Sequence, residues 1–345
     1  RLYPITHTGP KQLVPIANKP VLDYAIDDLR DAGITEIGVI LGNKGREAIQ
    51  EHLGDGSEYG VDITYIVQGD PLGLAHAVGC ARDFVGDDSF VVYLGDDLMR
   101  EGIEDLVNDF DEYTYAAGIG LQEVEEPSRY GVVGLDDQGD VTELVEKPDD
   151  PPSNYALIGI YVFTPAIFEQ IERLEPSWRG ELEITDAIQG LLHDGHSIQS
   201  HIVHGWWKDT GKPEDVLHAN RLVLDGIETE LDGTVEDEES ISGRIDLRDG
   251  AVIEEGAVVR GPVSIGEDTR IGSEAYIGPY SSIGANSEID HAHIESSVTM
   301  GQNTITADRI IVDSLIGRQA TITSNAGKQP DGDRMVIGRN STLEL

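Results

Sequence analysis

The feature that most constrains this chain is a six-residue spacing of aliphatic side chains in its last third. From Ile241 to Ile289 every sixth residue is Ile, Leu or Val, without a gap. This period is typical of a parallel β-helix, in which each hexapeptide forms one side of a triangular coil and turns its aliphatic side chain inward. We therefore predict a hexapeptide-repeat β-helix over residues 241–345, with a break in the rhythm at IDHAHIESSVTM and further aliphatic positions at Ile316, Ile322, Ile337 and Leu343.

The first two thirds of the chain follow a different rhythm. Over residues 1–226, short β-branched runs alternate with helical patterns, which predicts an α/β domain, Rossmann-like, with a mixed and mostly parallel sheet. Ligands of such sheets bind beyond the carboxyl ends of the strands. Residues 227–240 are acidic, contain few large apolar side chains and are predicted to be a linker. The expected strands are EIGVIL, VDITYIV and SFVVYL; the expected helices are PVLDYAIDDLRDAG, GLAHAVGCARDFV and PEDVLHANRLVLDG.

The charge of the chain is strongly one-sided. Its 24 Lys and Arg residues face 65 Asp and Glu residues, for a formal net charge of −41. Nucleic acids and acidic membranes attract basic surfaces, so both are excluded as partners. The acidic residues are spread along the sequence, and this favours a folded protein from a very salty cytoplasm, where salt screens self-repulsion. The single cysteine, Cys80, excludes an internal disulfide, and no stretch is apolar enough to span a bilayer.

Two short segments carry charges at places where ligands bind. Arg1 and Lys11 flank an extended, proline-punctuated opening segment, where they are either ordinary solvated charges or part of an anion site. SFVVYLGDD ends a buried strand with Asp96 and Asp97, and Asp209 precedes a predicted helix. These carboxylates are either turn and cap residues or oxygen ligands of the kind that Mg²⁺ prefers.

The chain resembles one enzyme family along nearly its whole length. The motifs that carry the resemblance are, in order, R-L-x-P-x-T, P-K-Q-L-x-P-I-x-N-K-P, QGDPLGLAHAV, Y-G-V…E-K-P, RGELEITDAI and W-x-D-T-G. The chain is similar to the glucose-1-phosphate thymidylyltransferases, which are sugar-1-phosphate nucleotidyltransferases, in the long form with a C-terminal left-handed β-helix. In that family a strand and a glycine-rich loop precede the position of Arg1. The resemblance implies that this sequence lacks both.

The resemblance also implies a reaction and its site. A sugar 1-phosphate, expected to be glucose 1-phosphate, would attack the α-phosphorus of dTTP and release pyrophosphate with the help of Mg²⁺. UTP is left open as the alternative nucleotide, which would make the protein a uridylyltransferase. By analogy, the catalytic residues are Arg1, Lys11 and Lys147; the nucleotide is bound by Gln12, Gln68, Gly73 and Asp96; the sugar phosphate is bound by Gly131, Glu146, Lys147, Asn154, Gly159, Tyr161 and Glu183; and the metal is bound by Asp96 and Asp209.

A different class of function also fits the tail. Hexapeptide β-helices house acetyltransferases that use a histidine as base, and His291 and His293 stand in the interrupted part of the repeat. A β-helix acetyltransferase, or a bifunctional enzyme, is therefore the second hypothesis. The β-helix also offers a surface through which two or three copies could assemble.

Overall fold

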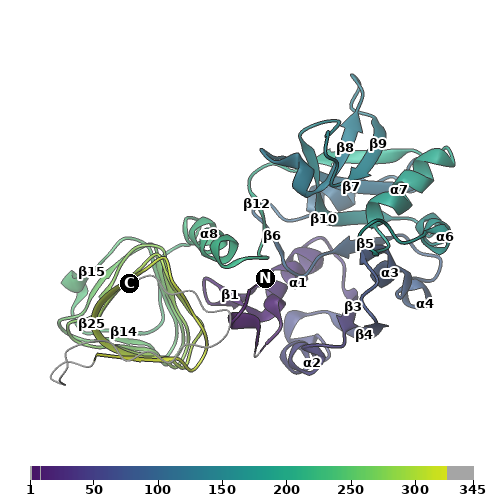
Figure 1. Ribbon diagram of the computed structural model, residues 1–345. Coiled ribbons are helices and arrows are strands. Elements are labelled where there is room, and N and C mark those ends of the chain that lie inside the picture. The colour runs from purple at the N-terminus through teal and green to yellow at the C-terminus, as the bar shows by residue number, and fades with distance from the viewer. Residues whose placement is uncertain (1, 8, 325–345) are drawn as a thin grey trace. The chain divides into compact units, whose positions relative to one another are not determined.

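The structure, a computed structural model, describes residues 2–7 and 9–324. It divides into two compact units (Figure 1). The first unit combines residues 1–22 with residues 208–345, and the second comprises Asp23–Trp207. The predicted domain boundary at residue 226 is therefore not the boundary between these units, because both the start of the chain and the helix after Asp209 belong with the β-helix. Each unit is described by itself.

The second unit is built on a six-stranded mixed sheet. Its order is β11-β7-β10-β8-β9, with β5 also paired to β10. β11 pairs with β7 in parallel, whereas β10 is antiparallel to β5, β7 and β8. The predicted α/β class is confirmed, but the sheet contains fewer parallel pairs than the alternating pattern suggested, because the β8–β9 hairpin and β10 return directly along their neighbours. The strands are β5 (Phe90–Tyr93), β7 (Ala117–Glu123), β8 (Gly131–Leu135), β9 (Val141–Glu146), β10 (Tyr155–Phe163) and β11 (Ile198–Ile202).

A separate parallel pair and several helices complete this unit. β3 (Glu36–Gly42) runs parallel to β4 (Asp62–Gly69), and the short β6 (Asp97–Met99) follows β5. The expected helix GLAHAVGCARDFV is in fact two short helices, α3 and α4, with the break after Gly79, a residue of low helix propensity. The helices are α1 (Val21–Asp31), α2 (Arg46–Leu53), α3 (Leu74–Gly79), α4 (Arg82–Val85), α5 (Glu104–Asn108), α6 (Ala166–Arg173) and α7 (Ile184–His193), with 3₁₀ turns η3 (Ser57–Tyr59) and η4 (Pro127–Arg129).

The core of this unit lies between the sheet and the helices α6 and α7. Phe163 of β10, Ile167 of α6 and Ile188 and Leu191 of α7 are fully buried in one apolar cluster. The large apolar area removed from water here fixes the sheet, and with it the loops that leave the ends of β5, β9 and β10.

The first unit begins with a short arm and a helix. The arm contains η1 (Ile5–His7), η2 (Lys11–Leu13) and an antiparallel hairpin of β1 (Pro15–Ile16) and β2 (Lys19–Pro20). β12 (Trp207–Asp209) enters this unit and leads to α8 (Pro213–Leu224), the expected helix at PEDVLHAN.

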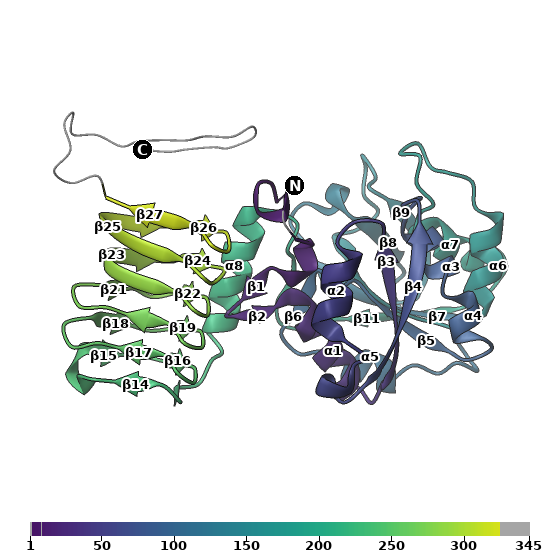
Figure 2. The same ribbon diagram turned by 90° about the horizontal axis from the view of Figure 1, so that it is seen from below.

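The remainder of the first unit is a parallel β-helix with a triangular cross-section, seen end-on in Figure 1 and from the side in Figure 2. Of the nine aliphatic residues predicted to point inward, the eight from Leu247 to Ile289 have no exposed surface, and Ile241 is partly buried. The β-helix prediction is confirmed for the described residues; Ile337 and Leu343 lie outside them. The strands are β15 (Ile241–Ser242), β16 (Ile245–Leu247), β17 (Val252–Ile253), β18 (Val258–Arg260), β19 (Val263–Ile265), β20 (Arg270–Ile271), β21 (Tyr276–Ile277), β22 (Ser281–Ile283), β23 (Glu288–Glu295), β24 (Val298–Thr299), β25 (Thr304–Val312), β26 (Leu315–Ile316) and β27 (Thr321–Thr323).

Two details of the β-helix differ from the sequence pattern. Strands β13 (Glu230–Leu231) and β14 (Thr234–Val235) pair in parallel with β16 and β17, so the stretch predicted as a linker forms part of the first coil; η5 (Glu238–Ser240) follows. The acidic side chains of this stretch point outward, and its composition gave no indication that it forms paired strands. The break in the rhythm is a shift of register in β23 between Asp290 and Ala292, which brings the buried Ile289 and Ile294 only five residues apart.

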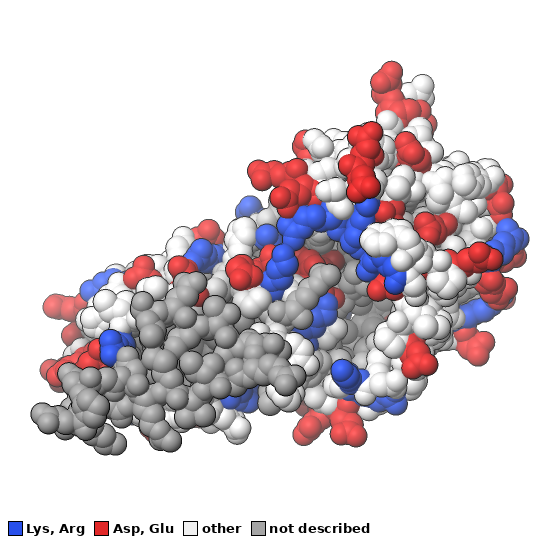
Figure 3. All heavy atoms as spheres, viewed as in Figure 1, with Lys and Arg blue, Asp and Glu red and all other residues white. Residues whose placement is uncertain are grey.

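The surface reflects the composition. On the face drawn in Figure 3, Asp and Glu side chains are spread over the visible surface and are not gathered in one patch. Among the described residues, no helix combines the length and apolar character needed to cross a bilayer.

Candidate active site

The loop after β5 holds two neighbouring carboxylates in a fixed position. Asp97 is 2% exposed, and its Oδ2 accepts a hydrogen bond from the Gly159 N–H of β10 (3.0 Å). The Leu94 N–H in turn donates to the Gly159 carbonyl oxygen (2.9 Å). A Cβ atom at Gly159 would collide with Asp97 Oδ2. Glycine is therefore required at position 159 to seat this loop, a reason different from the predicted contact with the sugar.

Asp96 and Asp97 offer carboxylate oxygens within 4.8 Å of each other, and Asp96 is partly exposed. Two hard oxygen donors at the carboxyl end of a strand suit Mg²⁺, which is usually held by one or two carboxylates together with substrate phosphates. Of these two neighbours, sequence reasoning assigned only Asp96 to the metal. The signal that points to Asp97 is its place directly after Asp96 at the same strand end.

Asp209 is the last residue of β12 and belongs to the first unit. It is not the cap of the following helix, because α8 begins at Pro213 and Lys212 occupies the cap position. Asp209 follows Trp207 by two residues, and the Trp207 ring makes an edge contact with Tyr130 in the second unit (5.5 Å between centroids). Since a strand advances about 3.3 Å per residue, the backbone keeps Asp209 within roughly 7 Å of that anchored tryptophan.

A compact charged cluster lies at the end of β9. Lys147 Nζ donates to Glu146 Oε1 (2.6 Å), and Arg179 Nη1 donates to the same oxygen (3.2 Å) and to Glu183 Oε1 (3.3 Å). The hydroxyl of Thr185 donates to the other Glu146 oxygen (3.0 Å). Three predicted site residues are thus brought together, with two cations and two carboxylates close enough to bind a phosphate and hydroxyl groups at once.

Glu183 has an ion-pair role within this cluster. It is 5% exposed and accepts hydrogen bonds from Ser177 Oγ (2.9 Å) and Arg179, but its side chain does not cap α7. Sequence reasoning missed Arg179. The available signal was its position in RGELEITDAI, four residues before Glu183, a spacing at which a turn can pair the two side chains.

The other predicted sugar-site residues lie in different environments. Gly131 is packed so closely that a Cβ atom would lie 2.6 Å from the Thr185 methyl carbon, which makes glycine necessary beside the charged cluster. Asn154 is exposed. Tyr161 is 4% exposed and stacks on Phe163 in the core (5.6 Å between centroids, 8° between planes), and burial raises the pKa of its hydroxyl. This placement favours a packing role for the Tyr161 ring and does not support the predicted sugar contact.

Gln68 and Gly73, predicted to bind the nucleobase, are adjacent. Gln68 Nε2 lies 3.2 Å from the Gly73 carbonyl oxygen and 3.3 Å from His76 Nδ1. Gly73 has a φ of 118° and packs against the backbone of Leu182, where a Cβ atom would lie 2.5 Å from the Leu182 nitrogen. The glycine is required by this close approach of two chain segments, whatever binds beside it.

The predicted phosphate-binding residues belong to the arm of the first unit. Lys11 and Gln12 are half-buried and form the start of η2. Arg1 lies outside the described residues. His291 and His293, the basis of the acetyltransferase hypothesis, are exposed on the β-helix; His291 Nδ1 is 2.9 Å from Glu274 Oε2, and His293 packs near Tyr276.

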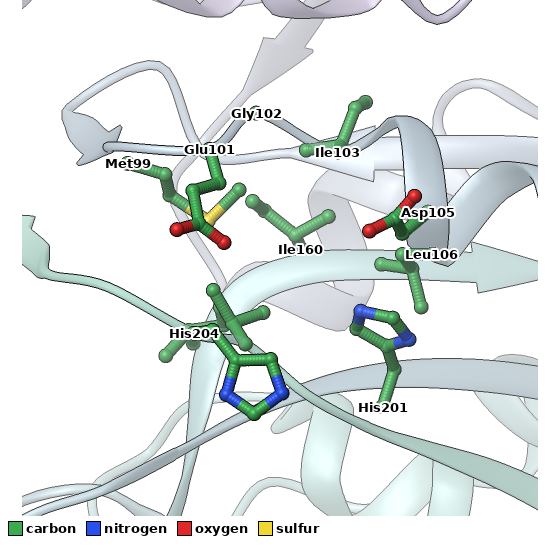
Figure 4. Close-up of a pocket in the computed structure, with 11 residues that line it drawn as sticks. Met99, Glu101, Gly102, Ile103, Asp105, Leu106, Ile160, His201 and His204 are labelled. Atoms are coloured by element: carbon green, nitrogen blue, oxygen red, sulfur yellow. The ribbon is translucent and has the colours of Figure 1, made fainter.

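A pocket of the second unit is lined by other residues. Its volume is about 30 Å³, and it is bordered by β6, α5, β10 and β11. In Figure 4, His201 and His204 lie opposite Asp105 and Glu101. A space of this size holds about one water molecule, so the pocket is too small for a nucleotide or a sugar, and it contains none of the predicted site residues.

Comparisons with known proteins identify the family of the chain. Residues 1–226 match the family described as nucleotidyl transferase, and residues 240–343 match the GMPPB C-terminal domain. The low-salt glycan biosynthesis nucleotidyltransferase Agl11 of Haloferax volcanii is 63% identical over 345 residues, which cover 100% of this chain and 97% of that protein.

The glucose-1-phosphate thymidylyltransferase of Streptomyces antibioticus is 47% identical and also covers 100% of this chain, with 96% of its own length matched. A crystal structure from Bacillus anthracis, assigned as a glucose-1-phosphate thymidylyltransferase and bound to sucrose, is 38% identical with a TM-score of 0.61, covering 66% of this chain and 92% of that one. The family match across the catalytic half and the full-length similarity lead to one conclusion: this chain belongs to the nucleotidyl transferase family.

Proposed function

We propose that this enzyme transfers a nucleoside monophosphate from dTTP to glucose 1-phosphate, giving dTDP-glucose and pyrophosphate. The observation that carries the proposal is the cluster at the end of β9, where Lys147 and Arg179 both contact Glu146 Oε1. A sugar phosphate needs cations for its phosphate and carboxylates that accept hydrogen bonds from its hydroxyl groups, and Glu146 and Glu183 supply the latter. The Streptomyces relative, which matches the full chain, is named for this activity.

In this proposal Asp96, Asp97 and Asp209 are the oxygen ligands of a magnesium ion. The fit rests on the donors themselves, which are all carboxylates. The ion, when bound, would supply positive charge to the phosphates of the nucleotide. Asp96 and Asp209 are the ligands that the sequence predicted, and Asp97 is added on the basis of its position.

The protein's own groups position the reactants and offset charge. Lys147 and Arg179 would hold the sugar phosphate, whose oxygen forms the new bond to the α-phosphorus as the bond from that phosphorus to pyrophosphate breaks. Lys11, with Arg1, would offset the charge on the departing pyrophosphate. The attacking phosphate is ionised near neutral pH, since its second pKa is about 6, so no general base is required. Gln68 would orient the base.

The choice of nucleotide is the finer part of the proposal. Gln68 presents an amide to the edge of a pyrimidine, and this group suits the shared edge of thymine and uracil. We propose dTTP on the strength of the full-length thymidylyltransferase relative. A uridylyltransferase that uses UTP is the second candidate. The acidic surface supports an enzyme that works at high salt, where its self-repulsion is screened.

The test is a product assay with the full-length protein at molar KCl, with glucose 1-phosphate and either dTTP or UTP. We expect dTDP-glucose, and loss of at least 100-fold of the rate in Asp96→Asn and Asp209→Asn because each removes a charged ligand. Asp87→Asn is the matched control, since Asp87 is exposed and precedes β5, whereas Asp96 follows the other end of that strand. UDP-glucose as the preferred product would select the second candidate. Full activity in both site variants would contradict the proposal.

A further inference from the structure

One face of the β-helix carries polar residues that point outward and are nevertheless buried. Asp246, Ser264 and Ser282 lie side by side on β16, β19 and β22 in parallel register. They are 5%, 0% and 0% exposed. The neighbouring Leu247, Ile265 and Ile283 fill the interior of the coil, so a strand's alternation turns the polar set to the outside. Outward-facing serines are buried only where another part of the protein covers them.

The cover is the tip of the β1–β2 hairpin. Its two turn residues, Ala17 and Asn18, have φ values of 46° and 63°, as a tight two-residue hairpin turn requires. Asn18 Nδ2 donates to Ser264 Oγ (2.9 Å), and that hydroxyl donates to Asp246 Oδ2 (2.8 Å). A single chain of hydrogen bonds therefore runs from the hairpin tip into the face of the β-helix.

Asn220 of α8 completes the contact. It is 1% exposed, and its Oδ1 accepts from the Ala17 N–H (2.9 Å) and from Ser282 Oγ (2.7 Å), while its Nδ2 donates to the Tyr280 carbonyl oxygen (3.0 Å). Its amide group thus joins α8 to two other segments, whose contacting residues lie 203 and 62 residues away in sequence. Figure 2 shows the hairpin and α8 against this face of the β-helix.

The hairpin connects rigidly to the residues predicted to bind phosphate. The Val21 N–H donates to the Val14 carbonyl oxygen (3.1 Å), and the Val14 N–H donates to the Lys11 carbonyl oxygen (3.1 Å). Val14 and Ile16 are 4% and 0% exposed. Because the arm is hydrogen-bonded from its tip back to η2 and is anchored by the buried Val14, Ile16 and Ala17, a displacement of the tip moves Lys11 as well.

We propose that Asn18, Asn220, Ser264 and Ser282, here called the arm seat, are positioning residues for the nucleotide. The β-helix then takes part in the reaction by fixing the arm that carries Lys11 and Gln12, although none of the β-helix residues that the structure describes is assigned a contact with the substrate. This inference rests on the proposed function, which assigns those two arm residues to the nucleoside triphosphate. It predicts that loosening the arm seat weakens triphosphate binding and leaves the sugar-phosphate site, built on β9 and α7, unchanged.

Two variants loosen the arm seat without disturbing the β-helix interior. Asn18→Gly keeps the positive φ at no steric cost and removes only the side-chain hydrogen bond. Ser282→Ala removes the second donor to Asn220 Oδ1. The matched control is Asn286→Gly, the same substitution at a left-handed position (φ 57°) that is exposed elsewhere on the β-helix. The full-length enzyme is assayed for KM of the triphosphate, KM of the sugar phosphate, kcat and thermal unfolding.

We expect a five- to tenfold rise in the triphosphate KM in Asn18→Gly and Ser282→Ala, about the effect of one net hydrogen bond, with the sugar-phosphate KM within twofold and the control unchanged. An unchanged triphosphate KM in Asn18→Gly overturns the inference. A uniform fall in kcat that parallels the loss of thermal stability also overturns the inference, because such a fall would show that the substitutions act on the fold and not on the position of the arm. If Ser282→Ala folds poorly, Asn18→Gly decides. A wild-type enzyme that makes no nucleotide sugar would instead refute the proposed function.

Discussion

Replacing Gly159 by alanine tests whether the loop at the end of β5 must be held in one position for activity. The Gly159 N–H donates to Asp97 Oδ2, and its carbonyl oxygen accepts from the Leu94 N–H. An added Cβ atom would collide with Asp97 Oδ2 and would lie 2.5 Å from Leu94 Cδ1. Carbon atoms in contact are normally about 3.5–4.0 Å apart, so the loop must move by at least about 1 Å.

The size of the effect follows from that movement. Overpacking of a buried site costs about 1–3 kcal/mol, and for a unit of this size each kcal/mol lowers Tm by about 2–4 °C. Activity should suffer more than stability, because misplacing a reacting group by about 1 Å lowers the rate roughly 100-fold. We therefore expect kcat/KM of Gly159→Ala to fall about 100-fold while the protein remains folded.

The assay measures nucleotide-sugar formation at several magnesium concentrations, with thermal unfolding monitored in the same buffer. Gly42→Ala is the control, because a Cβ atom at Gly42 meets nothing within 4 Å. We expect the control to keep its activity. Wild-type kcat/KM in Gly159→Ala would refute the reasoning, since it would show either that the loop tolerates the movement or that Asp96 and Asp97 take no part in the reaction.

Two further predictions concern charged groups of the second unit. Arg179→Lys removes the planar guanidinium that contacts three carboxylates, and we expect a rise of about tenfold in the sugar-phosphate KM. Arg173→Lys, at an exposed position of α6, should leave this KM unchanged, and equal KM values in both variants would exclude Arg179 from the site. The hydrogen bond from His52 to Asp23 (2.6 Å) raises the pKa of His52, so its contribution to stability is fully present below the ordinary histidine pKa of about 6.5 and is lost as pH rises through the raised value. Between pH 5 and pH 9, the free energy of unfolding of the His52→Gln variant should therefore fall less than that of the wild type. An identical dependence of this free energy on pH in both proteins would contradict the prediction.

The β-helix could be predicted in detail because the sequence pattern that specifies it is local and repeats along the chain. Each coil places one aliphatic residue inside, and the same spacing recurs from Ile241 to Ile289. The spacing breaks at IDHAHIESSVTM, as the sequence indicates, and there the coil itself departs from six residues at the register shift before Ala292. The pattern failed at the acidic stretch, where the apolar residues of β13 and β14 are too few to indicate strands: Leu231 is exposed, and Val235 packs partly buried against the β-helix core.

The catalytic half was predicted well in its motifs and less well in its pairing. Buried runs identified β3, β4 and β5, but a run of β-branched residues does not reveal which neighbour it pairs with or in which direction. For the same reason Tyr161 could be expected in the site, although its strand turns the ring into the core against Phe163. Arg179 was overlooked since its partners, Glu146 and Glu183, become neighbours only after β9 and α7 pack together.

The arm seat marks the limit of what the sequence can disclose. Asn18 and Ser264 are separated by 246 residues, and neither differs in type from the many polar residues of turns and β-helix faces. A serine at an outward position of a hexapeptide is ordinary when water covers it, and only its complete burial indicates that it has a partner. Since the contact joins the arm to a domain in which the proposed nucleotidyl transfer assigns no residue to the substrates, its purpose is best explained by what the arm holds. The most informative substitutions in the β-helix are therefore those at its buried polar face, because the aliphatic interior reports on folding alone.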